Sequence, residues 1–425
     1  MIQLFGFQRS VLERTKGFNR VAYYMDMGLG KTFVGSEKLA VLGSHVNLLI
    51  CQKSKIKDWI NHFKENYPEF LVYDLTKKDA LVDFLCKVES SPKIGIINYE
   101  LTFRRPELLM LRDFTLMLDE SSLIQNETAK RTKFVMKLQP KNVILLSGTP
   151  TDGKYERLWS QIQLLGWSIR KDTFMKQYVE TVWVDDGDGH FRQAIVGYKN
   201  VDRLKRKLAE HGAIFMKTEE AGIELPEQII VPVTVESSKE YKKFMKSRLV
   251  TVEGRELVGD TALTKLLYAR MLCGQFNQDK LEAFRDLINS TGDRLIVFYN
   301  FNEELDKLLA ICEHFERPCS IVNGQTKDLE AYETRSDSIT FVQYQAGSMG
   351  LNLQKTNKTI YFTLPLSAEQ WIQSHKRTHR LGQKNTCFYY YMMCRDSVEE
   401  HILDTLKMRK DYTDELFTEY EGQIK

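Results

Sequence analysis

The stretch that decides the fold is VAYYMDMGLGKTFVGSEKLAVL, residues 21–42. It opens with a short apolar run, continues with a loop that holds two glycines, and closes with an amphipathic segment. A strand, a tight turn and a helix in this order are typical of α/β proteins built on a parallel sheet. Ligands of such proteins bind at the carboxyl ends of the strands. The stretch therefore predicts one unit of a parallel sheet, with the glycine loop at its binding edge.

The loop MDMGLGKT has the composition of a phosphate-binding loop. Gly28 and Gly30 allow the backbone to curl so that its N–H groups point at phosphate oxygens. The start of the next helix adds a partial positive charge. Lys31 can reach the outer phosphates, and the Thr32 hydroxyl can ligate magnesium. The strict motif has a glycine where this chain has Met25, and the alternative interpretation is a structural glycine-rich turn.

Apolar runs alternate with amphipathic segments along most of the chain. The predicted strands are VNLLICQ (46–52), KIGIINY (93–99), FTLMLDE (114–120), KNVILLSG (141–148), RLIVFYN (294–300), PCSIVNG (318–324), SITFVQY (338–344) and KTIYFTL (358–364). The predicted helices include KIKDWINHFKENY (55–67), ETAKRTKFVMKLQ (127–139), NEELDKLLAICEHF (302–315) and SAEQWIQSHKRTHR (367–380). The middle, roughly 150–290, is charged and mostly helical, with a hairpin at 182–198. The pattern predicts an α/β protein of two lobes, each a mostly parallel sheet flanked by helices, with helical insertions between them.

Two further strand ends carry polar residues. The stretch LMLDESS (116–122) places Asp119 and Glu120 directly after an apolar run. We expect Asp119 to hold magnesium and Glu120 to act as the general base that polarises the attacking water. Paired acids at a strand end also occur without function, and the pairing with GKT in the same lobe favours catalysis. The turn LLSGTPTDG (145–153) ends a third strand and can sense the outer phosphate.

Bulk properties set the class of protein. The chain has 425 residues, a net charge of +3 and seven cysteines without a CxxC pair. This length predicts two or three domains, and the cysteine usage predicts a reduced, intracellular protein without structural zinc. No run approaches the roughly 20 apolar residues that span a bilayer, so we expect no membrane association.

The motifs occur in the order of a known superfamily. FQRSVLE, MDMGLGKT, LLICQKSKIKDWINHF, IGIINYELT, LDESSLIQN and LLSGTPTDGKYERLWSQIQLL lie in the first half. LIVFYNFNEELDKL, FVQYQAGSMGLNLQ and QSHKRTHRLGQ lie in the second half. The chain resembles the superfamily-two nucleic-acid ATPases, and most closely the Swi/Snf-type DNA translocases in a compact bacteriophage or bacterial form. Ser121 and Ser122 stand where the family usually has alanine and histidine, so the resemblance does not extend to the relay that the family runs through that histidine.

The resemblance implies two RecA-like lobes, 1–225 with a helical extension and 226–425, that use ATP and Mg2+. The implied cofactor-binding residues are Gln8 at the adenine, Gly28, Leu29, Gly30, Lys31, Thr32 and Gly350. The implied catalytic residues are Lys31, Asp119, Glu120, Gln373, Arg377 and Arg380, with Thr32 and Asp119 as metal ligands. The implied nucleic-acid contacts are Lys53, Lys55, Ser348 and Asn352.

The arginines of RTHRLGQ (377–383) stand three residues apart, which on a helix places them on one face. No carboxylate lies near them in sequence, since the nearest are Glu369 and Asp396. The resemblance implies that Arg377 and Arg380 are arginine fingers for ATP, a role that suits the planar guanidinium group. The alternative is a solvated basic helix face.

The expected function is an ATP-dependent DNA translocase or helicase with a role in DNA repair, recombination or replication. Duplex DNA is the expected partner ahead of single-stranded DNA, and the protein is expected to be a monomer in the cytoplasm of a bacterial or virus-infected cell. No clear wedge insert is present, so we expect movement without much strand separation. One alternative is an RNA helicase or RNA-dependent ATPase. Another is a non-catalytic subunit that binds ATP as a structural ligand.

Overall fold

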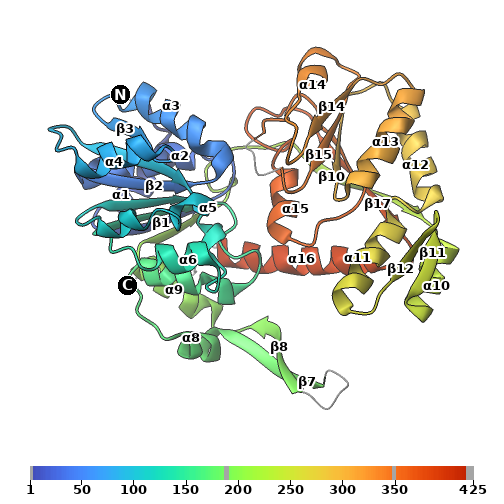
Figure 1. Cartoon of the computed structure of the whole chain (residues 1–425), viewed down its shortest axis with the longest axis horizontal. Helices are drawn as coiled ribbons and strands as arrows, with labels where there is room; N and C mark the ends of the chain where they lie inside the picture. The colour runs from blue at the N-terminus through green and yellow to red at the C-terminus, as the bar shows by residue number, and fades with distance from the viewer. Residues whose placement is uncertain (1–2, 186–190, 347–350, 418–425) are drawn as a thin grey trace. The chain divides into compact units, whose positions relative to one another are not determined.

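The computed structural model describes residues 3–185, 191–346 and 351–417. The chain forms two compact units. Unit 1 consists of Met1–Ile223 and Asp411–Lys425, and unit 2 consists of Glu224–Lys410. Figure 1 shows a sheet with helices on both faces in each unit, which confirms the predicted α/β class with two RecA-like lobes.

Unit 1 is built on one parallel sheet. Its strands lie in the order β3-β4-β2-β5-β6-β1-β9, and each neighbouring pair is parallel. The strands are β1 (Arg20–Met25), β2 (Val46–Cys51), β3 (Leu71–Asp74), β4 (Lys93–Asn98), β5 (Thr115–Asp119), β6 (Asn142–Ser147) and β9 (Ala213–Met216). The helices and 3-10 turns are α1 (Gly6–Arg14), α2 (Lys31–Leu42), η1 (Lys53–Lys55), α3 (Ile56–Asn66), α4 (Lys78–Cys86), α5 (Tyr99–Thr102), η2 (Pro106–Met110), η3 (Ser121–Ile124), α6 (Lys130–Val135), η4 (Tyr155–Leu158), α7 (Trp159–Leu164), α8 (Lys171–Tyr178) and α9 (Val201–Glu210).

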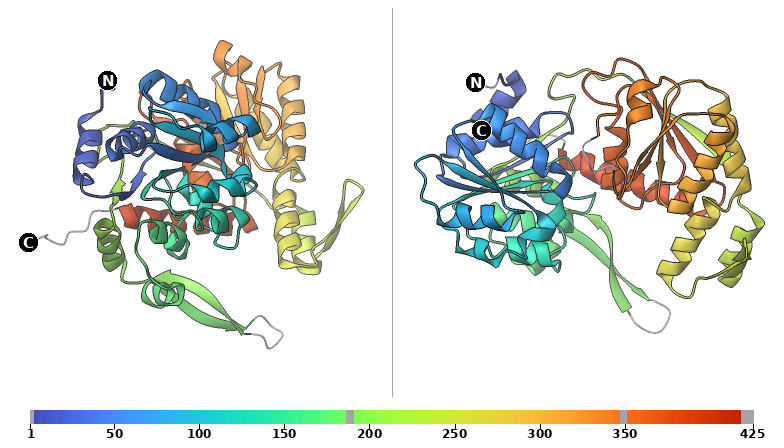
Figure 2. Two further views of the ribbon diagram at one scale, coloured as in Figure 1. Left: turned by 60° about the vertical axis from the view of Figure 1, so that its left-hand side comes forward. Right: turned by 45° about the horizontal axis from the view of Figure 1, so that its top comes forward.

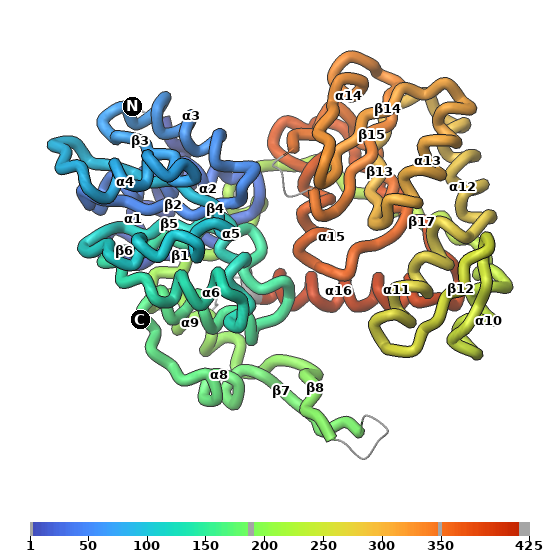
Figure 3. Tube along the Cα trace, viewed as in Figure 1, coloured from blue at the N-terminus to red at the C-terminus, as the bar shows by residue number. Residues whose placement is uncertain are grey.

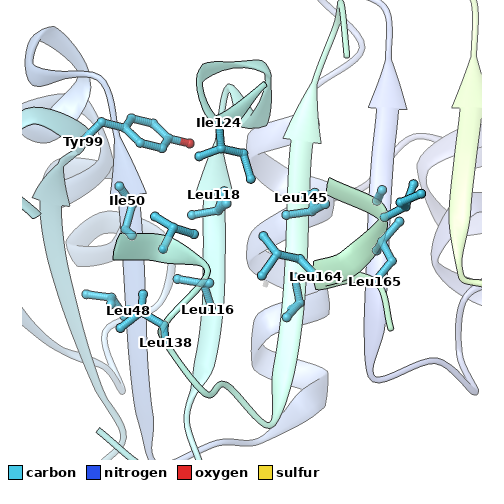
Figure 4. Packing of buried hydrophobic residues seen from close by; sticks show 14 of the residues in the cluster. Leu48, Ile50, Tyr99, Leu116, Leu118, Ile124, Leu138, Leu145, Leu164 and Leu165 are labelled. Carbon is cyan, nitrogen blue, oxygen red and sulfur yellow. The ribbon is translucent and has the colours of Figure 1, made fainter. Parts of the chain in front are cut away.

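The central strands of this sheet are buried on both faces, which explains why they appear in the sequence as unbroken apolar runs. Successive side chains of a strand point to opposite faces. Leu48 and Ile50 therefore join one core, whereas Leu49 and Cys51 join the core on the other face. Figure 4 shows Ile50, Leu118 and Leu145 on neighbouring strands of the first of these faces.

Unit 2 is built on a second parallel sheet, with the strand order β10-β17-β16-β13-β15-β14. The strands are β10 (Gln228–Val235), β13 (Leu295–Tyr299), β14 (Cys319–Val322), β15 (Ile339–Gln343), β16 (Lys358–Tyr361) and β17 (Cys387–Cys394). The helices are α10 (Lys239–Ser247), α11 (Ala262–Cys273), α12 (Gln278–Asn289), α13 (Asn302–His314), α14 (Glu330–Thr334), α15 (Ala368–His375) and α16 (Val398–Phe417). Helix α16 begins in unit 2, and its residues from Asp411 on belong to unit 1.

Two antiparallel hairpins are separate from these sheets. One pairs β7 (Val179–Asp185) with β8 (Phe191–Tyr198) and confirms the predicted hairpin. The other pairs β11 (Leu249–Val252) with β12 (Arg255–Val258). The views in Figure 2 show the first hairpin extending away from the sheet of unit 1. Among the helices of the described residues, none has the length and apolarity needed to cross a membrane.

All eight strands predicted above occur at their predicted positions, but two predicted helices are too long. Helix α6 covers only the centre of 127–139, because the Asn126 side chain accepts the Thr128 N–H and draws the start of the segment into a turn. Helix α15 ends at His375. The next N–H groups form tight turns, and the Arg377 carbonyl accepts the N–H of Leu353.

As a result, Arg377 and Arg380 do not share a helix face, and the helical argument for their pairing is wrong. Both residues lie in the turns that follow α15. Figure 3 shows the course of the chain around α15.

A candidate nucleotide site at the strand ends of unit 1

The phosphate loop joins β1 to α2 with the geometry that its glycines predict. Gly28 has a φ of 89° and Gly30 a φ of 72°, both in the left-handed region that side chains disfavour. Gly30 is the N-cap of α2, so that the helix begins at Lys31. The Lys31 ammonium group donates to the carbonyls of Met25 (2.8 Å) and Asp26 (3.2 Å). The lysine charge is thus held over the loop, at the end of the helix that attracts anions.

Gln8 supports this loop from α1. Its Oε1 accepts the Phe5 N–H at 2.9 Å, and its Nε2 donates to the Leu29 carbonyl at 3.0 Å. A Cβ atom added to Gly30 would lie 2.4 Å from Gln8 Nε2. Gln8 is therefore a buried amide that holds the phosphate loop, next to a glycine whose replacement would displace it. Its predicted contact with adenine stays a prediction.

Asp119 and Glu120 stand at the end of β5, beside β6 in the sheet. The Trp59 indole N–H donates to Asp119 Oδ2 at 2.8 Å, and the Tyr99 hydroxyl donates to the Asp119 carbonyl at 2.9 Å. Burial raises the pKa of Asp119, while the Trp59 hydrogen bond and the Lys31 charge act in the opposite direction. Glu120 adopts a left-handed conformation with a φ of 54°, which is rare for a residue with a side chain.

The turn after β6 closes the same edge of the sheet. Ser147 Oγ lies 3.5 Å from Glu120 Oε2 and accepts the Thr149 N–H at 3.1 Å. A Cβ atom on Gly148 would lie 3.4 Å from Lys31 Nζ, which shows how closely this turn approaches the lysine. Within the described part of the chain, the buried Thr149 Oγ1 has no hydrogen-bond partner. A buried hydroxyl without a partner, in a turn that approaches Lys31 at Gly148, fits a site that receives a polar group.

The donors at this edge fit a nucleotide with magnesium. Lys31 supplies positive charge, and the start of α2 supplies backbone N–H groups for phosphate oxygens. Asp119 offers a carboxylate and Thr32 a hydroxyl, which are oxygen ligands of the kind that magnesium prefers. The structure thus brings Lys31, Asp119, Glu120 and the turn after β6 together. The joint ligation of a metal by Thr32 and Asp119 remains a prediction.

The predicted catalytic residues of unit 2 lie around the end of α15. Gln373 is buried and its Nε2 donates to Glu369 Oε1 at 3.2 Å. Arg377 is buried and its Nη1 donates to the Leu351 carbonyl at 3.3 Å. Arg380 is half-buried, and burial lowers the pKa of its guanidinium group. The three side chains therefore belong to one region of unit 2, and their roles remain predictions.

The predicted nucleic-acid contacts divide into two groups. Lys53 and Asn352 are exposed, as a contact to a phosphate backbone requires. Lys55 is half-buried and forms an ion pair of 3.0 Å with Asp58. Ser348 and Gly350 lie outside the described residues.

One group of side chains in unit 2 resembles a metal site without fitting one. Cys273, Cys394 and Glu399 bring their ligand atoms within 4.8 Å of one another. The Glu399 carboxylate is already paired with the buried Lys280 ammonium group, at 2.7 and 2.9 Å. A metal cation would be repelled by the Lys280 charge. We therefore interpret the group as a structural Lys280–Glu399 ion pair with two cysteines beside it.

Sequence reasoning missed the residues that support the site. Trp59 and Tyr99 hold Asp119, although they lie in segments that the sequence predicts as a helix and a strand end. Their spacing from Asp119 is large, and nothing local in the sequence indicates the contact. One signal was available for Trp59. It lies on helix α3, which follows β2, and β2 is the neighbour of β5, so the helix begins at the same edge of the sheet as Asp119.

Comparison with known proteins identifies two family models that match the chain. The SNF2-related domain matches residues 24–280, and the helicase conserved C-terminal domain matches residues 279–382. The chain is 24% identical to SWI/SNF-related matrix-associated actin-dependent regulator of chromatin subfamily A member 1 of Mus musculus, over 91% of this chain and 40% of that protein. It is 23% identical to the ISWI chromatin-remodeling complex ATPase ISW2 of Saccharomyces cerevisiae, over 91% of this chain and 38% of that protein.

A solved structure is also similar. The Sulfolobus solfataricus SWI2/SNF2 ATPase core in complex with dsDNA is 20% identical, with a TM-score of 0.43, over 97% of this chain and 92% of that chain. The chain spans about two fifths of the length of the two curated relatives named above. Because the SNF2-related domain accounts for more than half of its residues, the chain belongs to the SNF2-related family.

Proposed function

We propose that the protein is an ATP-dependent DNA translocase, which hydrolyses ATP to move along double-stranded DNA. The observation that carries this proposal is the edge of the unit 1 sheet. There the phosphate loop with Lys31, the carboxylates of Asp119 and Glu120, and the turn after β6 meet. Membership of the SNF2-related family supports the same reaction.

In the proposed reaction, each residue of unit 1 has a defined task. The backbone of Gly28 to Gly30 and the Lys31 ammonium group bind the phosphates of ATP. Thr32 and Asp119 would hold magnesium, which supplies positive charge to the phosphate oxygens when bound. Glu120 orients the attacking water and accepts its proton. Gln8 fixes the loop from behind through the Leu29 carbonyl.

We assign to unit 2 the residues that stabilise the charge developing in the transition state. Arg377 and Arg380 act as arginine fingers, and Gln373 senses the outer phosphate. A fork of N–H donors that stays charged stabilises a transferring phosphoryl group, and one finger contributes roughly 10³–10⁵ to turnover in enzymes that use it. Hydrolysis then changes how the two units hold the nucleotide, and the change moves the DNA.

We propose that the DNA is held by its phosphates, because a motor that moves along any sequence cannot depend on base edges. Lys53, Lys55, Ser348 and Asn352 are the proposed contacts. Duplex DNA is the proposed track and a role in DNA repair, recombination or replication the proposed setting. A monomer is the proposed working form.

Steady-state ATP hydrolysis tests this proposal. The rate is measured with no nucleic acid, with duplex DNA, with single-stranded DNA and with RNA. We expect strong stimulation by duplex DNA. We also expect an Arg377→Ala variant to lose this stimulation while it still binds ADP, because its substitution lies outside unit 1. A Lys31→Ala variant should lose hydrolysis under all conditions.

Each alternative outcome has a clear meaning. Stimulation by RNA but not by DNA would establish an RNA-dependent ATPase. Hydrolysis that no nucleic acid stimulates would remove the main support for a motor. A Glu120→Gln variant that hydrolyses ATP at the unchanged rate would indicate that the carboxylate plays no part in the chemistry.

A further inference from the structure

A single buried amide connects the turns around the candidate site. Gln161 lies on α7 and is fully buried. Its Oε1 accepts hydrogen bonds from the hydroxyls of Ser121 (2.8 Å) and Tyr24 (3.0 Å). Its Nε2 donates to the Pro150 carbonyl at 2.8 Å. The amide thus uses both its acceptor and its donor, which a buried polar group requires.

The three partners of Gln161 lie in, or shortly after, three neighbouring strands. Tyr24 stands near the end of β1, just before the phosphate loop, and Ser121 directly follows Glu120 at the end of β5. Pro150 belongs to the turn after β6, which lies between these two strands in the sheet. All the residues involved lie in unit 1. One side chain therefore joins the phosphate loop, the catalytic carboxylates and the turn that approaches Lys31.

The connection holds a strained residue. Glu120 has a left-handed backbone, with φ 54° and ψ 61°. Such a conformation persists only where the surroundings fix it, and it is typical of functional positions. On one side, the Tyr99 hydroxyl donates to the Asp119 carbonyl. On the other side, the Glu120 carbonyl accepts the Leu123 N–H at 2.9 Å, and the side chain of the next residue, Ser121, is held by Gln161 through its Oγ.

The turn after β6 is held by the same network. The Pro150 carbonyl accepts a second hydrogen bond, from Gln125 Nε2 at 3.0 Å. Arg157 in turn donates to Gln125 Oε1 at 3.1 Å. A displacement of this turn must therefore break or move the Gln161 amide, which also contacts Ser121. Buried networks of this kind respond as units.

We propose that Gln161, together with Ser121, is the positioning pair that couples the Glu120 carboxylate to the turn after β6. Ser121 stands where the family usually has alanine, so its hydroxyl is an addition next to the position at which Ser122 replaces the family's histidine. Neither residue touches the reacting atoms. This inference rests on the proposed ATPase function, because it assigns the residues that align its general base.

Kinetics of four single variants and of the double variant Gln161→Leu/Ser121→Ala test the pair. Gln161→Leu removes the amide, Ser121→Ala removes the hydroxyl, and Ser121→Thr retains a hydroxyl. Gln163→Leu is the matched control. It lies on the same helix, and its amide also bonds to backbone carbonyls, those of Trp167 and Ile169, which lie outside the network. The readouts are kcat and KM for ATP with saturating duplex DNA, and the shift in Tm that ADP with magnesium produces.

The expected result is a loss of kcat without a loss of binding. Gln161→Leu should lower kcat about tenfold, while KM and the ADP-induced shift in Tm stay within about twofold of the wild type. Ser121→Ala should act in the same direction, and the double variant should be no slower than Gln161→Leu alone. Ser121→Thr should restore most of the rate, and Gln163→Leu should keep it.

Several outcomes would overturn the inference. They are an unchanged kcat in both Gln161→Leu and Ser121→Ala, an equal loss of kcat in Gln163→Leu, and additive losses in the double variant. If Gln161→Leu does not fold, the comparison of Ser121→Ala with Ser121→Thr decides alone. A wild-type chain that hydrolyses no ATP would overturn the proposed function and this inference with it. An active wild type with unaffected variants would overturn the inference only.

Discussion

At the scale of single residues, the candidate site contains residues with a positive φ, among them Gly30 and Glu120. Gly30 combines a positive φ with a close approach to Gln8, and Glu120 tolerates a positive φ although it has a side chain. The two cases differ in cause. The glycine conformation costs little by itself, whereas the glutamate conformation must be held by its neighbours. Substitution of Gly30 therefore tests a steric limit, whereas Glu120 illustrates a conformation that its neighbours impose.

Gly30→Ala should abolish nucleotide binding. The new methyl group would lie 2.4 Å from Gln8 Nε2, and the φ of 72° would be strained for alanine. The ADP-induced shift in Tm should disappear, and the unfolding free energy should fall by about 1–3 kcal/mol. Gly6→Ala is the control, because no atom lies within 4 Å of the position of its added Cβ. A normal ADP-induced shift in Gly30→Ala would contradict the role of the loop.

His375 should make unit 2 less stable in acid. Its Nε2 contacts the Tyr391 hydroxyl at 2.8 Å, and its Nδ1 contacts the Trp371 carbonyl at 2.8 Å. The pKa of His375 is lowered to about 4, mainly by burial and to a smaller extent by the positive charges of Lys410, Lys376 and His379, whereas the contact with the Trp371 carbonyl raises it. The unfolded chain binds this proton below its ordinary pKa of about 6.5, whereas the folded chain does not. The contribution of His375 to the unfolding free energy is therefore fully present above pH 6.5, and it is lost as the pH decreases towards 4.

Protonation of His375 should lower the unfolding free energy by at most about 3 kcal/mol. Urea unfolding at a series of pH values measures it, and His375→Gln should show a flatter dependence between pH 6.5 and 4. His401→Gln, a substitution at an exposed position of α16, should keep the wild-type dependence. Parallel curves for His375→Gln and the wild type would assign the acid sensitivity to other groups.

At the scale of elements, a buried ion pair joins two helices of unit 2. Lys280 on α12 and Glu399 on α16 have exposed side-chain fractions of 0% and 3%. The Glu399 carboxylate also accepts the Cys394 N–H at 2.9 Å. Buried pairs of this kind contribute little beyond what an apolar contact would, but the loss of one partner leaves an uncompensated charge.

Lys280→Met should therefore lower the unfolding free energy of unit 2 by about 3–5 kcal/mol. The double variant Lys280→Met/Glu399→Gln should recover much of this loss, because no charge remains buried and the amide oxygen can still accept the Cys394 N–H. Denaturant unfolding of the full chain measures both. A double variant as unstable as Lys280→Met would show that packing, and not charge, accounts for the loss.

The elements also show what the sequence can predict. Strands buried on both faces, such as β2 and β13, are evident as unbroken apolar runs between turn residues. Strand β10 escaped prediction because its residues alternate between half-buried and exposed and because it contains Pro232, which is typical of an edge strand. Helix α15 stops early because Leu353, distant in sequence, pairs with the Arg377 carbonyl.

The candidate site likewise combines residues that the sequence predicts with residues that it does not predict. The phosphate loop and the carboxylates are local motifs at strand ends, so their chemistry follows from spacing. Trp59, Tyr99 and Gln161 reach the site through contacts between residues that are distant in the sequence. A glutamine on a short helix has no periodic signal, and its partners are set by the fold. Sequence therefore predicts the groups that contact a ligand far better than those that position them.

At the scale of the whole molecule, the chain passes between its units at two points. The first follows Ile223 and the second follows Lys410, within helix α16. In unit 1 the end of this helix is anchored by aromatic rings. The Tyr155 hydroxyl donates to the Tyr412 carbonyl at 2.7 Å, and the rings of Tyr198 and Tyr412 lie 4.9 Å apart in an edge-to-face arrangement. These contacts fix the end of helix α16 within unit 1.

Tyr412→Ala should weaken this anchor. We expect the unfolding free energy of unit 1 to fall by about 1–3 kcal/mol, because aromatic contacts and buried area are lost. On the proposed function, stimulation of ATP hydrolysis by duplex DNA should decrease, while the ADP-induced shift in Tm stays unchanged because no nucleotide ligand is altered. Tyr412→Phe keeps the ring and the backbone carbonyl that Tyr155 contacts, so it should match the wild type in all three measurements. Full stimulation in Tyr412→Ala would contradict the expected role of this anchor.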